Sequence, residues 1–134
     1  MTRASSAFAE AARALVGNPF RLRGRDPASG IDCVGLVTCA LIAIGRVPPR
    51  LPHYTLRNID ITPLLAVLPD AGFQPASDDT QAGDLLLIRP SPGQYHLAIV
   101  DHAQQLIHAH AGLGRVVISP TPDRLRPAGH WRLY

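Results

Sequence analysis

Cys33 has the side chain with the clearest potential for chemistry, because it opens a long apolar segment. Within residues 34–44 the only polar side chains are Thr38 and Cys39, which predicts a helix that is buried on nearly every side. Asp32 is a good N-cap residue, so Cys33 takes the first helical position. The unpaired amides and the positive end of the helix dipole lower the pKa of a thiol there. The pattern predicts either a nucleophile or a small core residue, which is the commoner role of cysteine.

Histidine is the second residue type of interest. Four of the six histidines, namely His96, His102, His108 and His110, fall within residues 96–110, where the chain has a strand pattern. Three roles fit them. They are ordinary sheet residues, or His96, His108 and His110 bind zinc together with a cysteine, or one is a base for Cys33 and another orients it. The zinc hypothesis lacks the closely spaced Cys or His pairs that are typical of zinc sites.

Alternation along the strands allows the histidines to meet a nucleophile. His96 and Ala98 point to one face of a predicted strand, and the small Ala98 leaves room beside His96 for a helix end or a substrate backbone. A hairpin that turns at residues 102–104 can set His108 beside His96. His108 and His110 share a face, so this reasoning leaves open which of them orients the base.

The elements that position these residues follow the order of helices first and strands later. An amphipathic helix is predicted over residues 5–16, a loop over 18–30, and then the apolar helix, which ends at Gly45. An extended segment over 46–58 and a short helix starting at Thr62 come next. Strands are predicted at residues 85–88, 96–101, 105–110, 115–119 and 130–134. This order is typical of an α+β domain with an antiparallel sheet of about five strands.

The composition is that of one globular domain spanning residues 1–134, with 46% hydrophobic and 17% charged residues and no apolar run long enough to cross a membrane. Residues 1–17 lack the apolar core of a secretory signal, so we expect synthesis in the cytoplasm without a signal peptide. Cys33 and Cys39 point to different faces of one helix, which excludes a disulfide between them. All 13 basic residues are arginine. They are scattered among few aromatic residues, which argues against a nucleic-acid partner and leaves an acidic polymer or peptide as a candidate.

Four segments, taken in order, resemble the NlpC-type papain-like cysteine peptidases, a family of peptidoglycan endopeptidases. They are GIDCVGLV around Cys33, AGDLLLI at 82–88, HLAIVD at 96–101 and LIHAHAG at 106–112. The resemblance implies a papain-like α+β fold in which N-terminal helices pack on a C-terminal antiparallel sheet. One of those helices is central and buried, with Cys33 at its N-terminus. The LPHYT segment at 51–55 is similar to the phage-type subgroup, which is found with tail genes and gene-transfer-agent particles.

The resemblance also implies roles for individual residues. Cys33 matches the nucleophile, His96 matches the base, and His108 matches the third polar residue twelve positions later, which favours His108 over His110. The implied reaction is attack of the thiolate on an amide carbonyl, followed by hydrolysis of the thioester. Family members typically cut the bond between γ-D-glutamate and a diamino acid. No cofactor and no metal are expected.

Side chains around the nucleophile are expected to contact the substrate. They are Asp32, Phe20, Arg23 and Val34. The family usually has Ser where this chain has Val34, and often Tyr where it has Phe20, and loss of the Tyr hydroxyl allows the cleaved bond to differ from the family norm. Arg21, Arg23 and Arg25 either bind a carboxylate of the substrate or form a solvated basic loop.

The expected partner is a peptidoglycan stem peptide, with phage-tail or gene-transfer-agent proteins as further partners and without nucleic acid or membrane insertion. The expected location is a phage-like particle, or the periplasm or cell wall after delivery. Two alternatives keep the fold: a catalytically silent structural tail component and an injected amidase toxin. A metal-binding module is a third alternative, and it differs in its chemistry.

Overall fold

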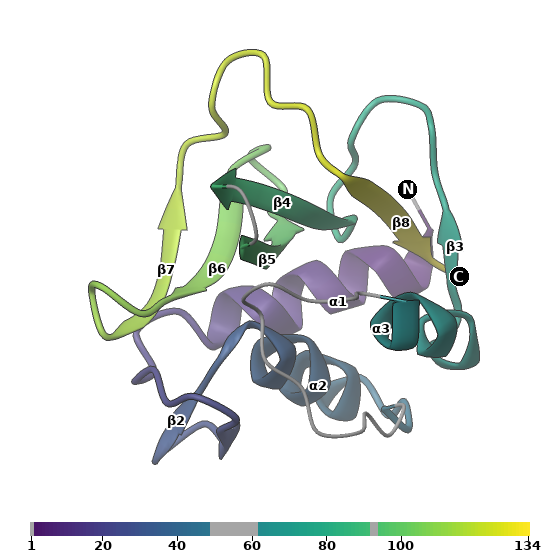
Figure 1. Cartoon of the computed structure of the whole chain (residues 1–134). Helices are drawn as coiled ribbons and strands as arrows, with labels where there is room; N and C mark the ends of the chain where they lie inside the picture. Colours follow the sequence, from purple (N-terminus) through teal and green to yellow (C-terminus); the bar gives the residue numbers. More distant parts are fainter. Residues whose placement is uncertain (1, 49–61, 92–93) are drawn as a thin grey trace.

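Two helices and one sheet form the two layers of the protein. The computed structural model describes residues 2–48, 62–91 and 94–134. Helices α1 (Arg3–Ala14) and α2 (Cys33–Ala43) pack below a six-stranded antiparallel sheet in the view of Figure 1. Helix α3 (Thr62–Val67) and the short 3-10 helix η1 (Pro69–Ala71) lead into the first strand of this sheet. The arrangement confirms the predicted α+β fold, including the buried helix that begins at Cys33.

The last strand of the chain lies in the interior of the sheet, between two other strands. Its strands are β3 (Phe73–Pro75), β4 (Leu85–Ser91), β5 (Gln94–Val100), β6 (Leu106–His110), β7 (Arg115–Ser119) and β8 (Gly129–Leu133). Their spatial order is β3-β8-β4-β5-β6-β7, and every neighbouring pair is antiparallel. Strands β4 to β7 are consecutive hairpins, so the part of the sheet that carries His96, His108 and His110 is built from local connections.

Strand β3 is the strand that the sequence did not predict, which is why the sheet has six strands and not about five. It has three residues, ends in Pro75 and pairs with β8 through Phe73 opposite Leu133. A strand this short at a sheet edge carries too little alternation to be recognised, and its proline argues against a strand. The predicted loop over 18–30 also contains a small ladder of β1 (Arg25–Asp26) and β2 (Gly30–Ile31). Most of the predicted extended segment, and LPHYT at 51–55, lie outside the described residues.

Helix α2 is central because its apolar residues contact both the other helix and the sheet. Its side chains share one core cluster with Phe8 of α1 and Leu97 of β5. Asp32 is the N-cap, as predicted, and its Oδ1 accepts the backbone N–H of Gly35 at 2.8 Å. A Cβ at Gly35 would overlap the carbonyl oxygen of Gly24. The loop before α2 therefore lies directly against the first turn of the helix.

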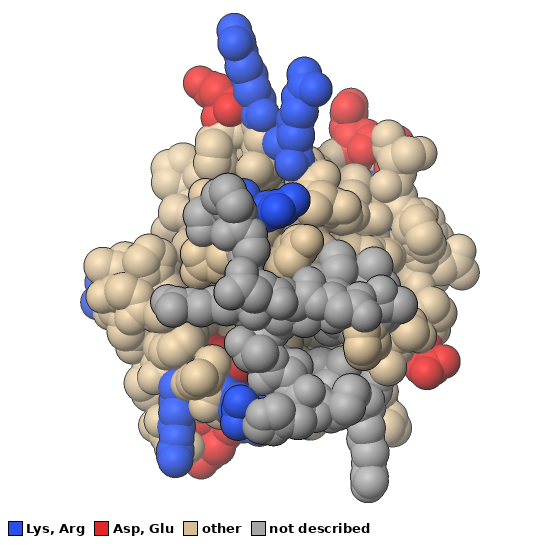
Figure 2. Space-filling model, viewed as in Figure 1, with Lys and Arg blue, Asp and Glu red and all other residues tan. Residues whose placement is uncertain are grey.

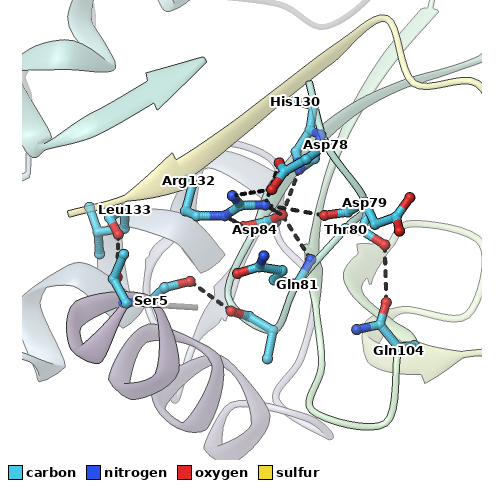
Figure 3. Close-up of polar contacts among 12 residues, drawn as sticks. Ser5, Asp78, Asp79, Thr80, Gln81, Asp84, Gln104, His130, Arg132 and Leu133 are labelled. Atoms are coloured by element: carbon cyan, nitrogen blue, oxygen red, sulfur yellow. Dashed lines mark hydrogen bonds and ion pairs between the residues drawn. The ribbon is translucent and has the colours of Figure 1, made fainter. Parts of the chain in front are cut away.

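A buried group of charges joins β4 to β8, as Figure 3 shows. Asp84, directly before β4, is fully buried and accepts the backbone N–H of Gln81. The Arg132 guanidinium donates to both carboxylate oxygens of Asp84, at 2.9 and 2.8 Å, and Nε2 of His130 lies 2.6 Å from Oδ2. Arg132 also donates to Asp78. Because each buried charge has an opposite charge and hydrogen bonds, the cluster holds β8 against β4 without an unpaired ion.

We predict that Asp84→Asn destabilises the protein by about 3–5 kcal/mol, because it leaves the buried Arg132 without its main anion. Urea unfolding followed by circular dichroism measures this change. Asp79→Asn is the matched control on the same loop, because only the backbone carbonyl of Asp79 contacts Arg132; we expect it to change the free energy of unfolding by less than about 0.5 kcal/mol. Equal effects of the two substitutions would contradict the role assigned to Asp84.

Candidate active site

Cys33 lies at the N-terminus of α2, where the helix meets β5. The residue is 2% exposed, and the backbone amides of Leu97, Val34 and Cys33 itself lie close enough to the sulfur to favour its thiolate. Burial nevertheless raises the pKa of the Cys33 thiol to about 12, and the negative charge of Asp32 adds to this rise. The expectation of a lowered thiol pKa is therefore wrong for the free protein. The helix-terminal amides act in the expected direction, but desolvation of the sulfur outweighs them.

His96 and His108 form a direct pair on neighbouring strands. Nε2 of His96 lies 3.0 Å from Nδ1 of His108, and the two rings are nearly perpendicular with centroids 5.0 Å apart. The hairpin of β5 and β6 pairs Ile99 with Ile107, and one further step in this register sets His108 across from Ala98. The contact with His96 is thus diagonal, over the small side chain of Ala98. The predicted placement of His108 beside His96 is confirmed.

Ser119 extends this pair and was not recognised in the sequence. Its Oγ lies 2.9 Å from Nε2 of His108, so that both ring nitrogens of His108 have partners. Ser119 is the last residue of β7, opposite Leu106 in the β6–β7 ladder. A serine at the end of a strand carries no signal of its own, and the contact depends on the register of two strands. The contact between Ser119 and His108 can be predicted only when the exact pairing of residues 106–110 with 115–119 is known.

Both histidines are held in their neutral form. Burial, followed by the charges of His108 and His110, lowers the pKa of His96 to about 4. Burial and the charge of His110 also lower the pKa of His108. A pair of neutral imidazoles shares one proton in its hydrogen bond. For Nδ1 of His96 to accept a proton from another group, Nε2 of His96 must donate to His108, and Nε2 of His108 must then donate to Ser119.

The fold brings the three predicted catalytic residues into one region, because a backbone amide next to His96 in the sequence faces the Cys33 sulfur. The amide that faces the Cys33 sulfur belongs to Leu97, the residue directly after His96. Among the described residues, no hydrogen bond connects the thiol to either imidazole of the pair. The catalytic roles of Cys33, His96 and His108 stay predictions that this geometry supports.

The residues predicted to contact substrate lie in different environments. Asp32 is buried, and its Oδ2 accepts the backbone N–H of Arg23 while its Oδ1 pairs with the Arg25 guanidinium at 3.1 Å. Val34 belongs to the core and is 4% exposed, and Phe20 is half-buried against the same core. The side chain of Arg23 is exposed. Contact of any of these residues with substrate stays a prediction.

Among the described residues, no group of three or more His, Cys, Asp or Glu side chains is arranged to hold a metal ion. Within the same residues, no helix is both long enough and apolar enough to cross a membrane. On the face shown in Figure 2, arginine side chains gather at the top and at the lower left, and acidic side chains lie near both groups. This differs from the continuous basic stripe that is typical of nucleic-acid binding.

A match to the model of a protein family shows which known proteins this chain is related to. The model of the NlpC/P60 family matches residues 17–125, which include Cys33, His96 and His108. The chain belongs to the NlpC/P60 family. No curated protein matches it.

Solved NlpC/P60 structures share the fold over nearly the whole chain. The NlpC/p60 domain of the peptidoglycan hydrolase SagA is 27% identical, with a TM-score of 0.64, and the match covers 94% of this chain and 96% of that domain. The peptidoglycan hydrolase RipB from Mycobacterium tuberculosis is 23% identical, with a TM-score of 0.60 and coverage of 98% and 67%. NlpC1 from Trichomonas vaginalis is 20% identical with a TM-score of 0.69, and the match covers 95% of this chain and 44% of that one.

We predict that Cys33 reacts slowly with iodoacetamide at neutral pH, because the thiolate is the reactive form and a pKa of about 12 leaves little of it. The alkylation rate should rise about tenfold per pH unit above neutrality. Mass spectrometry of a Cys39→Ala background measures the rate at Cys33 alone. The same chain in urea is the control and should react at the rate of an ordinary cysteine. A rate that is already constant between pH 6 and 8 would show a lowered pKa and contradict this prediction.

Proposed function

We propose that this NlpC/P60 protein is a cysteine peptidase that hydrolyses an amide bond in peptidoglycan stem peptides. Cys33 is the nucleophile, His96 the base, and His108 the group that orients it. The observation that carries the proposal is the hydrogen-bonded pair of His96 on β5 and His108 on β6, in which His96 directly precedes Leu97, the residue whose backbone amide faces the Cys33 thiol. Family membership adds to it, since SagA and RipB are both peptidoglycan hydrolases of similar fold.

The reaction starts from a neutral thiol and a neutral imidazole. The pKa of the Cys33 thiol, about 12, lies far above that of His96, about 4, so an ion pair is unfavourable before substrate binds. The proton therefore moves to His96 as the sulfur attacks the carbonyl carbon. The backbone amide of Cys33, at the start of α2, stabilises the oxyanion. His96 then protonates the leaving amine, and water hydrolyses the thioester.

His108 and Ser119 assist the reaction by stabilising the positive charge that develops on His96. When His96 is an imidazolium, its Nε2–H donates to His108, and the Nε2–H of His108 donates to Ser119. Each hydrogen bond strengthens the other in a site of low dielectric constant. This chain fixes the orientation of the His96 ring and stabilises its charged form, in the manner of the third residue of a catalytic triad.

The substrate and the setting follow from the resemblance of the sequence to NlpC-type peptidases. We propose that the cleaved bond joins γ-D-glutamate to a diamino acid, and that the enzyme acts in or with a phage-like or gene-transfer-agent particle that delivers it to the cell wall. The injected amidase toxin shares this chemistry and differs only in delivery. The exposed Arg21 and Arg23, in the loop that precedes the nucleophile in the sequence, are suited to a substrate that carries several carboxylates.

A catalytically silent tail component of the same fold is a second candidate function. The near-complete burial of Cys33 and the raised pKa of its thiol favour it, because both oppose the formation of a nucleophile. An activity assay separates the two candidates.

We predict that the protein releases new peptide fragments from purified sacculi, because the three proposed catalytic residues occupy one region of the fold. Liquid chromatography with mass spectrometry identifies the fragments and the bond that is cut. Cys33→Ala should abolish the products, whereas Cys39→Ala, on the same helix, should retain them. Activity should also persist after chelation with EDTA. The absence of fragments, or fragments that Cys33→Ala still produces, would favour the silent component.

We further predict that His108→Ala lowers kcat by on the order of 100-fold, because His96 then loses the partner that orients it. His110→Ala should lower kcat far less, since His110 has no hydrogen bond to His96. His102→Ala is the control, because this exposed residue lies in the turn between β5 and β6, away from the pair. Steady-state kinetics with a soluble muropeptide measures all three. Equal losses for His108→Ala and His110→Ala would contradict the assignment of His108.

A further inference from the structure

A groove of about 550 Å³ lies along the β6–β7 hairpin, next to the histidine pair. His108 and Ser119 form part of its wall, so the groove reaches the outer end of the chain of hydrogen bonds that begins at His96. His110 and Arg115 line it as well. The described residues that line the groove include no aspartate and no glutamate. Its titratable side chains are therefore one arginine and two histidines.

His110 and Arg115 are placed to act on one ligand. They are directly opposite each other in the β6–β7 ladder, so their side chains share a face of the hairpin. The backbone N–H of Leu113 donates to Nδ1 of His110 at 3.0 Å. The neutral ring of His110 then carries its proton on Nε2, which makes that nitrogen a donor. Arg115 forms no ion pair with a described acidic residue. A cation and a neighbouring N–H donor suit a carboxylate.

The direction of the reaction indicates which part of the substrate enters the groove. His96 hands its proton to the leaving amine, so the residue on the leaving side of the scissile bond must lie against His96. The imidazole of His108 lies next to both other rings, with ring centroids 5.0 Å from His96 and 5.8 Å from His110. The groove adjoins this group, because His108, His110 and Arg115 all line it.

We propose that the groove binds a carboxylate on the leaving side of the scissile bond, held by Arg115 and by Nε2 of His110. This proposal rests on the proposed peptidase function and specifies its substrate: an acidic diamino acid, and not one whose carboxylates are amidated. Binding in the groove also affects the pKa values of His96 and His108. A carboxylate bound there lies close to both imidazoles of the pair, and its negative charge favours their protonated forms, which raises both pKa values.

Two stem tripeptides test the proposal. Both carry the γ-D-glutamyl–diamino acid bond, and they differ only in that the carboxylates of the diamino acid are free in one and amidated in the other. The wild-type protein should favour the acidic peptide by about 10- to 100-fold in kcat/KM, as expected for a hydrogen bond to a charged group. Arg115→Gln should cleave the two peptides with similar kcat/KM. Arg3→Gln, at the far end of α1 and roughly 16 Å along the helix from its C-terminus, is the control and should keep the preference.

The same peptides separate failure of this proposal from failure of the proposed function. Hydrolysis that depends on Cys33, with no preference for the acidic peptide or with a preference that Arg115→Gln retains, overturns the carboxylate subsite and leaves the peptidase in place. If the protein hydrolyses neither peptide, calorimetry with the same pair decides. Tighter binding of the acidic peptide that is lost in Arg115→Gln, together with a rise in the histidine pKa values measured by NMR, supports the subsite without turnover. Equal binding of the two peptides overturns it.

Discussion

The geometry of the active site depends on the hydrogen bonds and the ion pair of the Asp32 carboxylate. This carboxylate accepts the backbone N–H of Gly35 in the first turn of α2 and that of Arg23 in the preceding loop, and it pairs with the Arg25 guanidinium. One buried anion thus holds the start of the helix and the loop before it together. Because Cys33 is the next residue, its place against β5 follows from this arrangement. The same charge raises the pKa of the thiol, so the residue that positions Cys33 also opposes its ionisation.

Burial gives the site its electrostatic character. It disfavours charge on both partners of the proposed reaction, which raises the pKa of the thiol and lowers that of His96. A resting ion pair is therefore absent from the proposed mechanism, and charge forms only as the sulfur attacks. The hydrogen bonds from His96 to His108 and on to Ser119 are already formed before charge develops. Preformed dipoles of this kind stabilise a developing charge without the cost of reorganising the site.

The sequence predicted the elements that carry strong local signals. Helix α2 was recognised from its apolar run and its N-cap, and the β5–β6 hairpin from alternation on both sides of a turn. Strand β3 was missed because it has three residues and ends in Pro75, so that its pairing with β8 supplies the evidence that its own sequence lacks. The direction of the thiol pKa was wrong for a related reason. A helix terminus is a local feature, whereas desolvation of Cys33 is the combined effect of every element packed around it.

What the sequence by itself determined are the local relations within the site. Asp32 precedes Cys33 at a helix start, and the hairpin spacing allows His108 or His110 to lie beside His96, because both relations follow from helix and strand periodicity over short stretches of chain. The tertiary structure alone decided the state of these groups. The neutral forms of the thiol and the imidazoles, the contact of Ser119 with His108 and the shared face of His110 and Arg115 depend on burial and on strand register. Those properties arise from contacts between distant segments, which no local pattern encodes.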